Sequence, residues 1–120
     1  MNEDPDIQDE KVWVESTGEV VRLRTKRGRP VCPVCGSLWS AGDEHAWHKS
    51  GESRPDGTPK VYPSYQICDC CNTEFGNDDT GGSDQSLASV WRLLRSEWLE
   101  KVGRCASALA QLRSNLGIDA

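Results

Sequence analysis

The chain has 120 residues, a formal net charge of −5 and 36% hydrophobic residues, so one small domain is expected. Leu, Ile, Val and Phe together supply 22 residues, too few for a large core, which predicts that a metal or disulfide is needed for folding. No apolar run reaches membrane-spanning length, and the acidic N-terminus lacks the apolar stretch of a secretory signal. These features exclude a membrane-embedded protein and predict a cytoplasmic one with reduced cysteines.

The first quarter of the chain is predicted to be a disordered acidic tail followed by a β-hairpin. Residues 1–10 hold five carboxylates and a single aliphatic side chain. Residues 12–15 and 20–25 are typical of two strands joined by a turn, because apolar and polar side chains alternate in the second of them. Five basic side chains lie along that strand and just beyond it: Arg22, Arg24, Lys26, Arg27 and Arg29. They could contact the phosphates of nucleic acid, or they could balance the negative charge of a nearby metal–thiolate centre.

Two Cys-x-x-Cys pairs, separated by 32 residues, predict a zinc site whose four ligands are Cys32, Cys35, Cys68 and Cys71. Two sulfurs on one side of a tight turn, met by two from a second turn, complete a tetrahedron around Zn²⁺ at about 2.3 Å per bond. Gly36 and Asn72 follow the pairs and readily accept a positive φ, which leaves backbone N–H groups free to face sulfur. Four thiolates leave no coordination position for water, so the zinc is expected to be structural.

The insert between the pairs, residues 37–66, is rich in Gly and Pro and is predicted to be mostly loop. Its end resembles an edge strand in which Val61, Tyr65 and Ile67 share one face.

His45 and His48 lie in the same insert. A His-x-x-His pair with acidic neighbours between two metal-binding turns resembles the HNH nucleases, which would use a bound metal and a histidine base. Exposed loop histidines are the simpler interpretation. Cys70 could replace Cys68 or Cys71 as a ligand, but Cys-x-Cys spacing suits such a turn less well, so it is expected to be a spare thiol. Cys105 is expected to be a small packing residue.

The last third of the chain carries the clearest pattern, a predicted amphipathic helix with Ser83 or Asp84 as N-cap and Gly117 just past its end. Nine apolar residues recur there at a mean spacing near 3.6: Leu87, Trp91, Leu94, Trp98, Val102, Cys105, Leu109, Leu112 and Leu116. Gly103 is a point at which this helix could bend or break. A small domain cannot cover the whole stripe, so its end is expected to fold back, dimerise or bind a partner. The candidate partner-binding residues are Trp98, Leu109, Leu112 and Leu116.

The segment from Tyr65 to Asp79 resembles the cysteine-rich CPCC proteins of bacteria, in which Tyr-x-Ile precedes Cys-Pro-Cys-Cys-Gly and an aromatic residue follows. The resemblance covers roughly residues 31–102, with Asp69 in place of the usual Pro and Asn72 in place of the usual Gly. It implies a zinc-ribbon-like domain, and some small bacterial proteins of this kind resemble immunity or antitoxin proteins.

These patterns together predict an α+β fold: an acidic tail over 1–10, a zinc-ribbon-like domain with an N-terminal hairpin over 11–82, and a helical segment over 83–120. The leading hypothesis is a non-catalytic, zinc-binding interaction module, with an immunity or antitoxin role as its specific form. Its partner would be another protein, or a second copy bound through the C-terminal helix. A nucleic-acid-associated zinc ribbon is the alternative, and a metal-dependent nuclease is a minor one.

Overall fold

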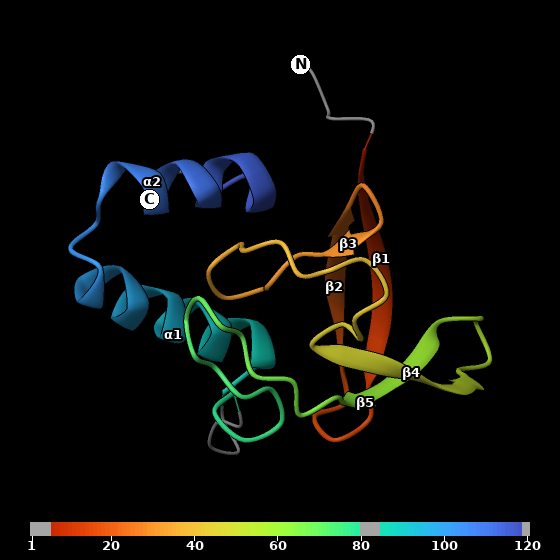
Figure 1. Cartoon of the computed structure of the whole chain (residues 1–120). Coiled ribbons are helices and arrows are strands. Elements are labelled where there is room, and N and C mark those ends of the chain that lie inside the picture. Colours follow the sequence, from red (N-terminus) through yellow and green to blue (C-terminus); the bar gives the residue numbers. More distant parts are fainter. Residues whose placement is uncertain (1–5, 80–84, 119–120) are drawn as a thin grey trace.

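The computed structural model describes residues 6–79 and 85–118. A five-stranded mixed sheet lies on one side and the helices on the other, with the two cysteine-bearing loops between them (Figure 1). The predicted α+β class is therefore confirmed. None of the helices in the described part of the chain is long and apolar enough to cross a membrane.

The predicted hairpin is confirmed and forms one half of the sheet. Strand β1 (Ile7–Val14) pairs antiparallel with β2 (Glu19–Lys26) along its whole length. Strand β1 begins at Ile7, so the predicted tail was too long; of its residues, 1–5 lie outside the described part. Pairing with β2 explains the difference, because Asp9 in the acidic segment forms an ion pair of 2.8 Å with Arg24 on the neighbouring strand.

The remaining strands come largely from the insert. Strand β3 (Arg29–Pro30) pairs with β2, while β4 (Trp47–Ser53) and β5 (Pro59–Pro63) form a second hairpin. Strand β5 lies between β1 and β4 and pairs parallel with the last two residues of β1, which joins the two hairpins into one sheet. The prediction that the insert is mostly loop was wrong for residues 47–53 and 59–63, which form these two strands.

The prediction that Val61, Tyr65 and Ile67 share one face of a strand was also wrong. Val61 is 2% exposed, whereas Tyr65 and Ile67 are 56% and 54% exposed. The strand ends at Pro63, and Tyr65 has a φ of 59°, so the backbone leaves extended geometry and the alternation of side chains stops.

The C-terminal third forms three short helical pieces instead of one long helix. Helix α1 (Leu87–Lys101) is capped by Ser86, whose side chain accepts from the N–H of Ser89; the predicted caps Ser83 and Asp84 lie outside the described residues. The helical conformation is interrupted around Gly103, the predicted position. The chain then continues as α2 (Ala106–Gln111) and η1 (Leu112–Leu116), a π-helical turn. Gly117 ends it in the left-handed conformation, as expected.

The break lets the apolar stripe fold back on the domain. Trp98 is 6% exposed and Leu112 fully buried, while Leu109 and Leu116 are half-buried against the same core. Of the three predicted outcomes for the stripe, the chain therefore shows the first, folding back. Trp98 and Leu112 are buried and do not offer a surface to a partner, while partner binding through the half-buried Leu109 and Leu116 stays a prediction. Cys105 was also misplaced: it is exposed and is the N-cap residue of α2, because the break removes it from the stripe.

Candidate metal centre

The first cysteine pair lies on a tight turn held by backbone hydrogen bonds. The N–H of Gly36 donates to the carbonyl of Cys32 at 2.9 Å, and the N–H of Cys32 donates to the carbonyl of Ser37, also at 2.9 Å. Gly36 has a φ of 81°, as predicted, which lets the chain reverse directly after Cys35.

The second pair repeats this turn 36 residues later. The N–H of Asn72 donates to the carbonyl of Cys68 at 2.7 Å, and the N–H of Cys68 donates to the carbonyl of Thr73 at 3.0 Å. Asn72 has the predicted positive φ, 62°. The arms correspond as well, since Val31 bridges Leu38 in the first turn and Ile67 bridges Glu74 in the second. The two turns are therefore equivalent units that present their sulfurs in the same way.

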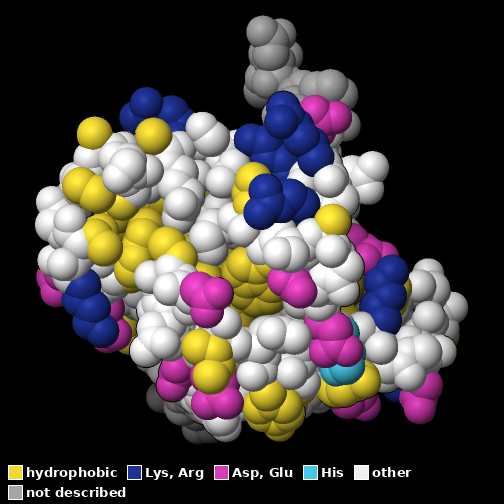
Figure 2. Space-filling model, in the orientation of Figure 1, with side chains coloured by type: hydrophobic (Ala, Val, Ile, Leu, Met, Phe, Trp, Pro, Cys, Tyr) yellow, Lys and Arg dark blue, Asp and Glu magenta, His cyan; other side chains and the backbone are white. Residues whose placement is uncertain are grey.

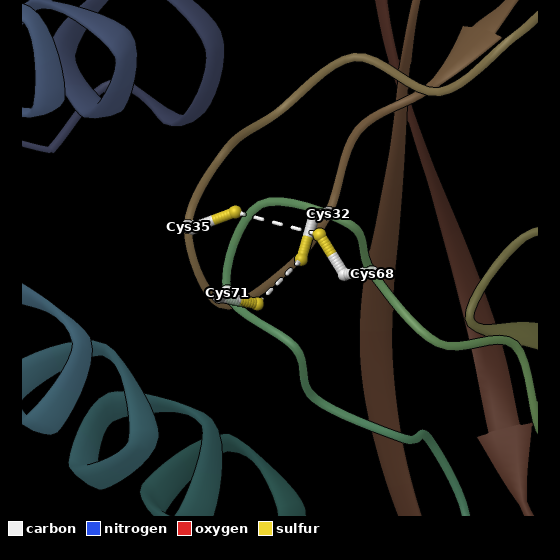
Figure 3. Close-up of side chains that lie close together, drawn as sticks. All are labelled: Cys32, Cys35, Cys68 and Cys71. Atoms are coloured by element: carbon white, nitrogen blue, oxygen red, sulfur yellow. Dashed lines mark hydrogen bonds between the residues drawn. The ribbon is translucent and has the colours of Figure 1, made fainter.

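The turns bring all four predicted ligand sulfurs together. The Sγ atoms of Cys32, Cys35, Cys68 and Cys71 lie within 4.8 Å of one another, and the Cys32–Cys71 and Cys35–Cys68 pairs are each separated by 3.7 Å (Figure 3). Sulfurs at the corners of a regular tetrahedron with bonds of about 2.3 Å would be about 3.8 Å apart. The cluster is thus tetrahedral-like and of a size that could hold a metal ion.

Burial and mutual hydrogen bonding set the protonation of these thiols. Burial raises the pKa of Cys32 well above its usual value. Hydrogen bonds from Cys32 and then Cys35 lower the pKa of both Cys68 and Cys71. The four sulfurs therefore do not ionise together on their own, because four adjacent buried negative charges would repel one another. A divalent cation would make the fully ionised set favourable.

Two hydroxyl groups that the sequence reasoning missed also face the sulfurs. The Oγ of Ser37 lies 3.3 Å from Sγ of Cys35 and 3.2 Å from Sγ of Cys68. Thr73, the equivalent residue of the second turn, places its Oγ1 3.3 Å from Sγ of Cys71. Both can donate hydrogen bonds to ionised sulfur. The signal was present in the sequence as an internal repeat, in which each Cys-x-x-Cys is followed by Gly or Asn and then by Ser or Thr.

A half-buried guanidinium binds the backbone of the first turn. Arg95 of α1 donates from Nε to the carbonyl of Val34 at 2.8 Å and from Nη2 to the carbonyl of Pro33 at 2.7 Å. Burial lowers the pKa of Arg95, while the negative charge of Cys32 and Cys35 opposes that shift. A tetrahedral centre of four thiolates and one divalent cation carries a charge of −2. The positive guanidinium of Arg95 lies where it offsets part of that negative charge.

The two histidines do not form a second site in the described residues. Nε2 of His45 lies 2.8 Å from the carbonyl of Arg24, so it carries the proton, and Nδ1 accepts from the N–H of Ala46 at 2.7 Å. With both ring nitrogens occupied and its pKa lowered by burial, His45 is a neutral structural residue. The ring of His48 contacts that of Tyr62, with centroids 3.7 Å apart and ring planes tilted by 53°. This geometry gives the predicted nuclease no free histidine base at position 45.

Most of the predicted basic stripe is engaged within the chain. Arg24 pairs with Asp9 and donates to the carbonyl of Asn115, and Lys26 donates to the Asn115 side chain. The other cations with intramolecular bonds are Arg27, paired with Asp6, and Arg29, which donates to the carbonyls of Leu38 and Trp39. Arg22 is exposed on β2. Contact between these residues and nucleic acid stays a prediction, and the intramolecular bonds disfavour it.

A buried carboxylate that the sequence analysis did not single out as a site residue connects the pieces around the centre. Asp79 is 1% exposed, and its Oδ2 accepts from the indole N–H groups of Trp47 at 2.9 Å and Trp91 at 3.0 Å. Its Oδ1 accepts from the N–H of Gly76 at 2.6 Å. Asp79 thus ties β4, the arm of the second turn and α1 together. Beside it, Phe75 is fully buried, with its ring centroid 5.8 Å from that of Trp39.

Comparison with protein-family models, curated proteins and solved structures finds no match. The resemblance to the cysteine-rich CPCC proteins therefore stays a prediction, and the functional argument depends on the site itself.

Proposed function

We propose that this chain is a non-catalytic binding protein whose fold is stabilised by one structural Zn²⁺ held by Cys32, Cys35, Cys68 and Cys71. The observation that carries the proposal is the convergence of four cysteine sulfurs to within 4.8 Å of one another on two equivalent turns. Four sulfurs fill the tetrahedral coordination of a structural zinc site, so no position stays open for a water nucleophile. The paired turns also support the zinc-ribbon-like interpretation of the domain.

Titration with Co²⁺ tests the metal part of the proposal, because tetrahedral cobalt bound to thiolates absorbs visible light strongly and zinc displaces it. We expect the wild type to bind one equivalent and Cys68→Ser to lose the thiolate spectrum. Cys70→Ser and Cys105→Ser are matched controls, since both thiols are exposed and neither belongs to the cluster. A normal spectrum in Cys68→Ser, or its loss in Cys70→Ser, would show that the ligand set is wrong.

The surface that supports protein binding lies between β5 and the second turn. Tyr62, Tyr65 and Ile67 are 45%, 56% and 54% exposed, which is high for large apolar side chains. Asp69 and Asp78 are exposed in the adjoining turn and arm. Figure 2 shows hydrophobic and acidic side chains interspersed over the lower part of the molecule, with most Lys and Arg side chains near the top and others at the left and right edges. This combination favours a protein partner with basic and apolar side chains.

Affinity capture with matched variants tests this surface. We expect wild type and Leu93→Ser, which alters a 51% exposed leucine on α1, to retain the same partner in stoichiometric amount. The double variant Tyr65→Ser, Ile67→Ser should bind it at least about tenfold more weakly. Equal binding by the double variant would exclude this surface. Identification of the partner as a toxin would give the proposal its immunity or antitoxin form.

A further inference from the structure

The C-terminal segment, residues 105–118, is attached to the backbone of the first cysteine turn. Gln111 Nε2 donates to the carbonyl of residue 35 at 2.9 Å, and Asn115 Nδ2 donates to that of residue 36 at 2.8 Å. Together with the two bonds from Arg95, helix side chains bind all four consecutive carbonyls of residues 33–36. The shape of this turn therefore determines whether the segment can dock.

Close packing at Gly36 also joins the C-terminal segment to the first cysteine turn. A Cβ added there would lie 3.3 Å from the carbonyl oxygen of Gln111 and 3.5 Å from Cδ1 of Leu116, so the segment packs directly on the turn. The turn and the segment are in contact through backbone as well as through side chains.

The segment is also attached by apolar packing and by two cations of β2. Helix α2 has six residues and η1 has five, and helices this short are not stable alone in water. Ala108 and Leu112 are buried, and Leu109, Leu116 and Ile118 are partly buried against the core. At its end, Arg24 Nη1 donates to the carbonyl of Asn115 at 3.1 Å, and Lys26 Nζ donates to the Asn115 side chain at 3.0 Å. The bonds to the cysteine turn thus hold the segment in place together with this apolar packing.

We propose that metal occupancy of the four-cysteine site controls the docking of residues 105–118. This inference rests on the proposed metal site. With the metal bound, both cysteines of the first turn are fixed and its carbonyls point at Gln111 and Asn115. Without the metal, the turn keeps its backbone hydrogen bonds and those from Arg95, but its two sulfurs are no longer fixed. The carbonyls of residues 35 and 36 then lose their fixed direction, and the segment is released with its Leu112 face exposed. The β1–β2 hairpin, which pairs along its whole length, stays folded.

Hydrogen–deuterium exchange of the 120-residue chain, with zinc and after chelation, tests the proposal. Amides of residues 106–116 should lose protection by about thirtyfold on chelation, the factor expected when two hydrogen bonds of ordinary strength are lost. Amides of β1 and β2 should change much less. The double variant Gln111→Ala, Asn115→Ala should lose protection in the same segment while its zinc content, measured by elemental analysis, stays at the wild-type level.

Two exchange results would overturn the proposal. Unchanged protection of residues 106–116 after chelation would show that docking is independent of the metal. Equal loss throughout the chain would show that the metal supports global folding and controls no separate segment. In both cases, zinc found bound to the wild-type chain would leave the proposed function intact. Absence of metal from the wild type would overturn the proposed function and this inference together.

Discussion

Replacement of Asp79 should destabilise the fold more than any other single change to an acidic residue discussed above. Its carboxylate accepts three hydrogen bonds, from two indole N–H groups and one backbone N–H, and all three donors surround a side chain that is 1% exposed. A buried donor left without a partner costs about 1 to 3 kcal/mol. Asp79→Ala should therefore cost about 4 kcal/mol, since loss of the buried charge offsets part of the sum.

Asp79→Asn keeps the size of the side chain and changes its hydrogen-bonding groups, so it measures the effect of hydrogen bonding on stability apart from that of size. Its single amide oxygen can accept from Trp47 and Trp91, but the amide NH₂ group then faces the N–H of Gly76, so one bond is lost and two are weakened. We expect a cost of about 2 to 3 kcal/mol. Urea unfolding in excess zinc, followed by tryptophan fluorescence and circular dichroism, measures it.

Asp78→Asn is the matched control, because Asp78 is exposed and accepts one hydrogen bond, from the N–H of Glu74. It should cost less than about 1 kcal/mol. If Asp79→Asn unfolds within about 0.5 kcal/mol of the wild type, the buried carboxylate does not join the three elements as argued.

Two further predictions concern His45 and Gly76. Burial lowers the pKa of His45 from its usual 6.5, so the unfolded chain takes up this proton first as pH falls. The stability that neutral His45 contributes is therefore complete above about pH 6.5 and is lost below it. Between about pH 7 and pH 5, His45→Gln should lose stability less steeply than the wild type; equal slopes would refute this role. Gly76→Ala should cost about 3 kcal/mol or more in urea unfolding, because its Cβ would lie 2.6 Å from Cβ of Pro63 at a φ of +107°. Gly42→Ala, with a similar φ and open space around it, should cost about 1 kcal/mol, and comparable costs would show that the close contact is not limiting.

The parts of the fold that depend on local chemistry could be predicted from the sequence. The hairpin follows from alternation between Val21 and Thr25, and the cysteine turns follow from Cys-x-x-Cys spacing with Gly36 and Asn72 behind it. The helix break at Gly103 was anticipated for the same reason. In each case a few neighbouring residues determine the backbone, and long-range packing agrees with them.

The parts that depend on long-range contacts could not be predicted. Strand β4 has a polar, Gly-containing sequence and forms because β5 pairs with it and with β1. Asp79 looks like one of several acidic residues in a linker, and only the distant Trp47 and Trp91 give it a buried role. The apolar stripe was recognised, but a period of 3.6 cannot show whether a partner or the same chain covers it.

Elemental analysis of the purified chain tests the four-thiolate zinc site most directly. The account predicts one zinc per chain in the wild type and in the Cys70→Ser, Cys105→Ser double variant, and none in Cys68→Ser. Sites of four thiolates can also hold iron, so the measurement must distinguish the two metals. Iron in place of zinc would contradict the account. A chain without metal, or full zinc content in Cys68→Ser, would contradict it as well.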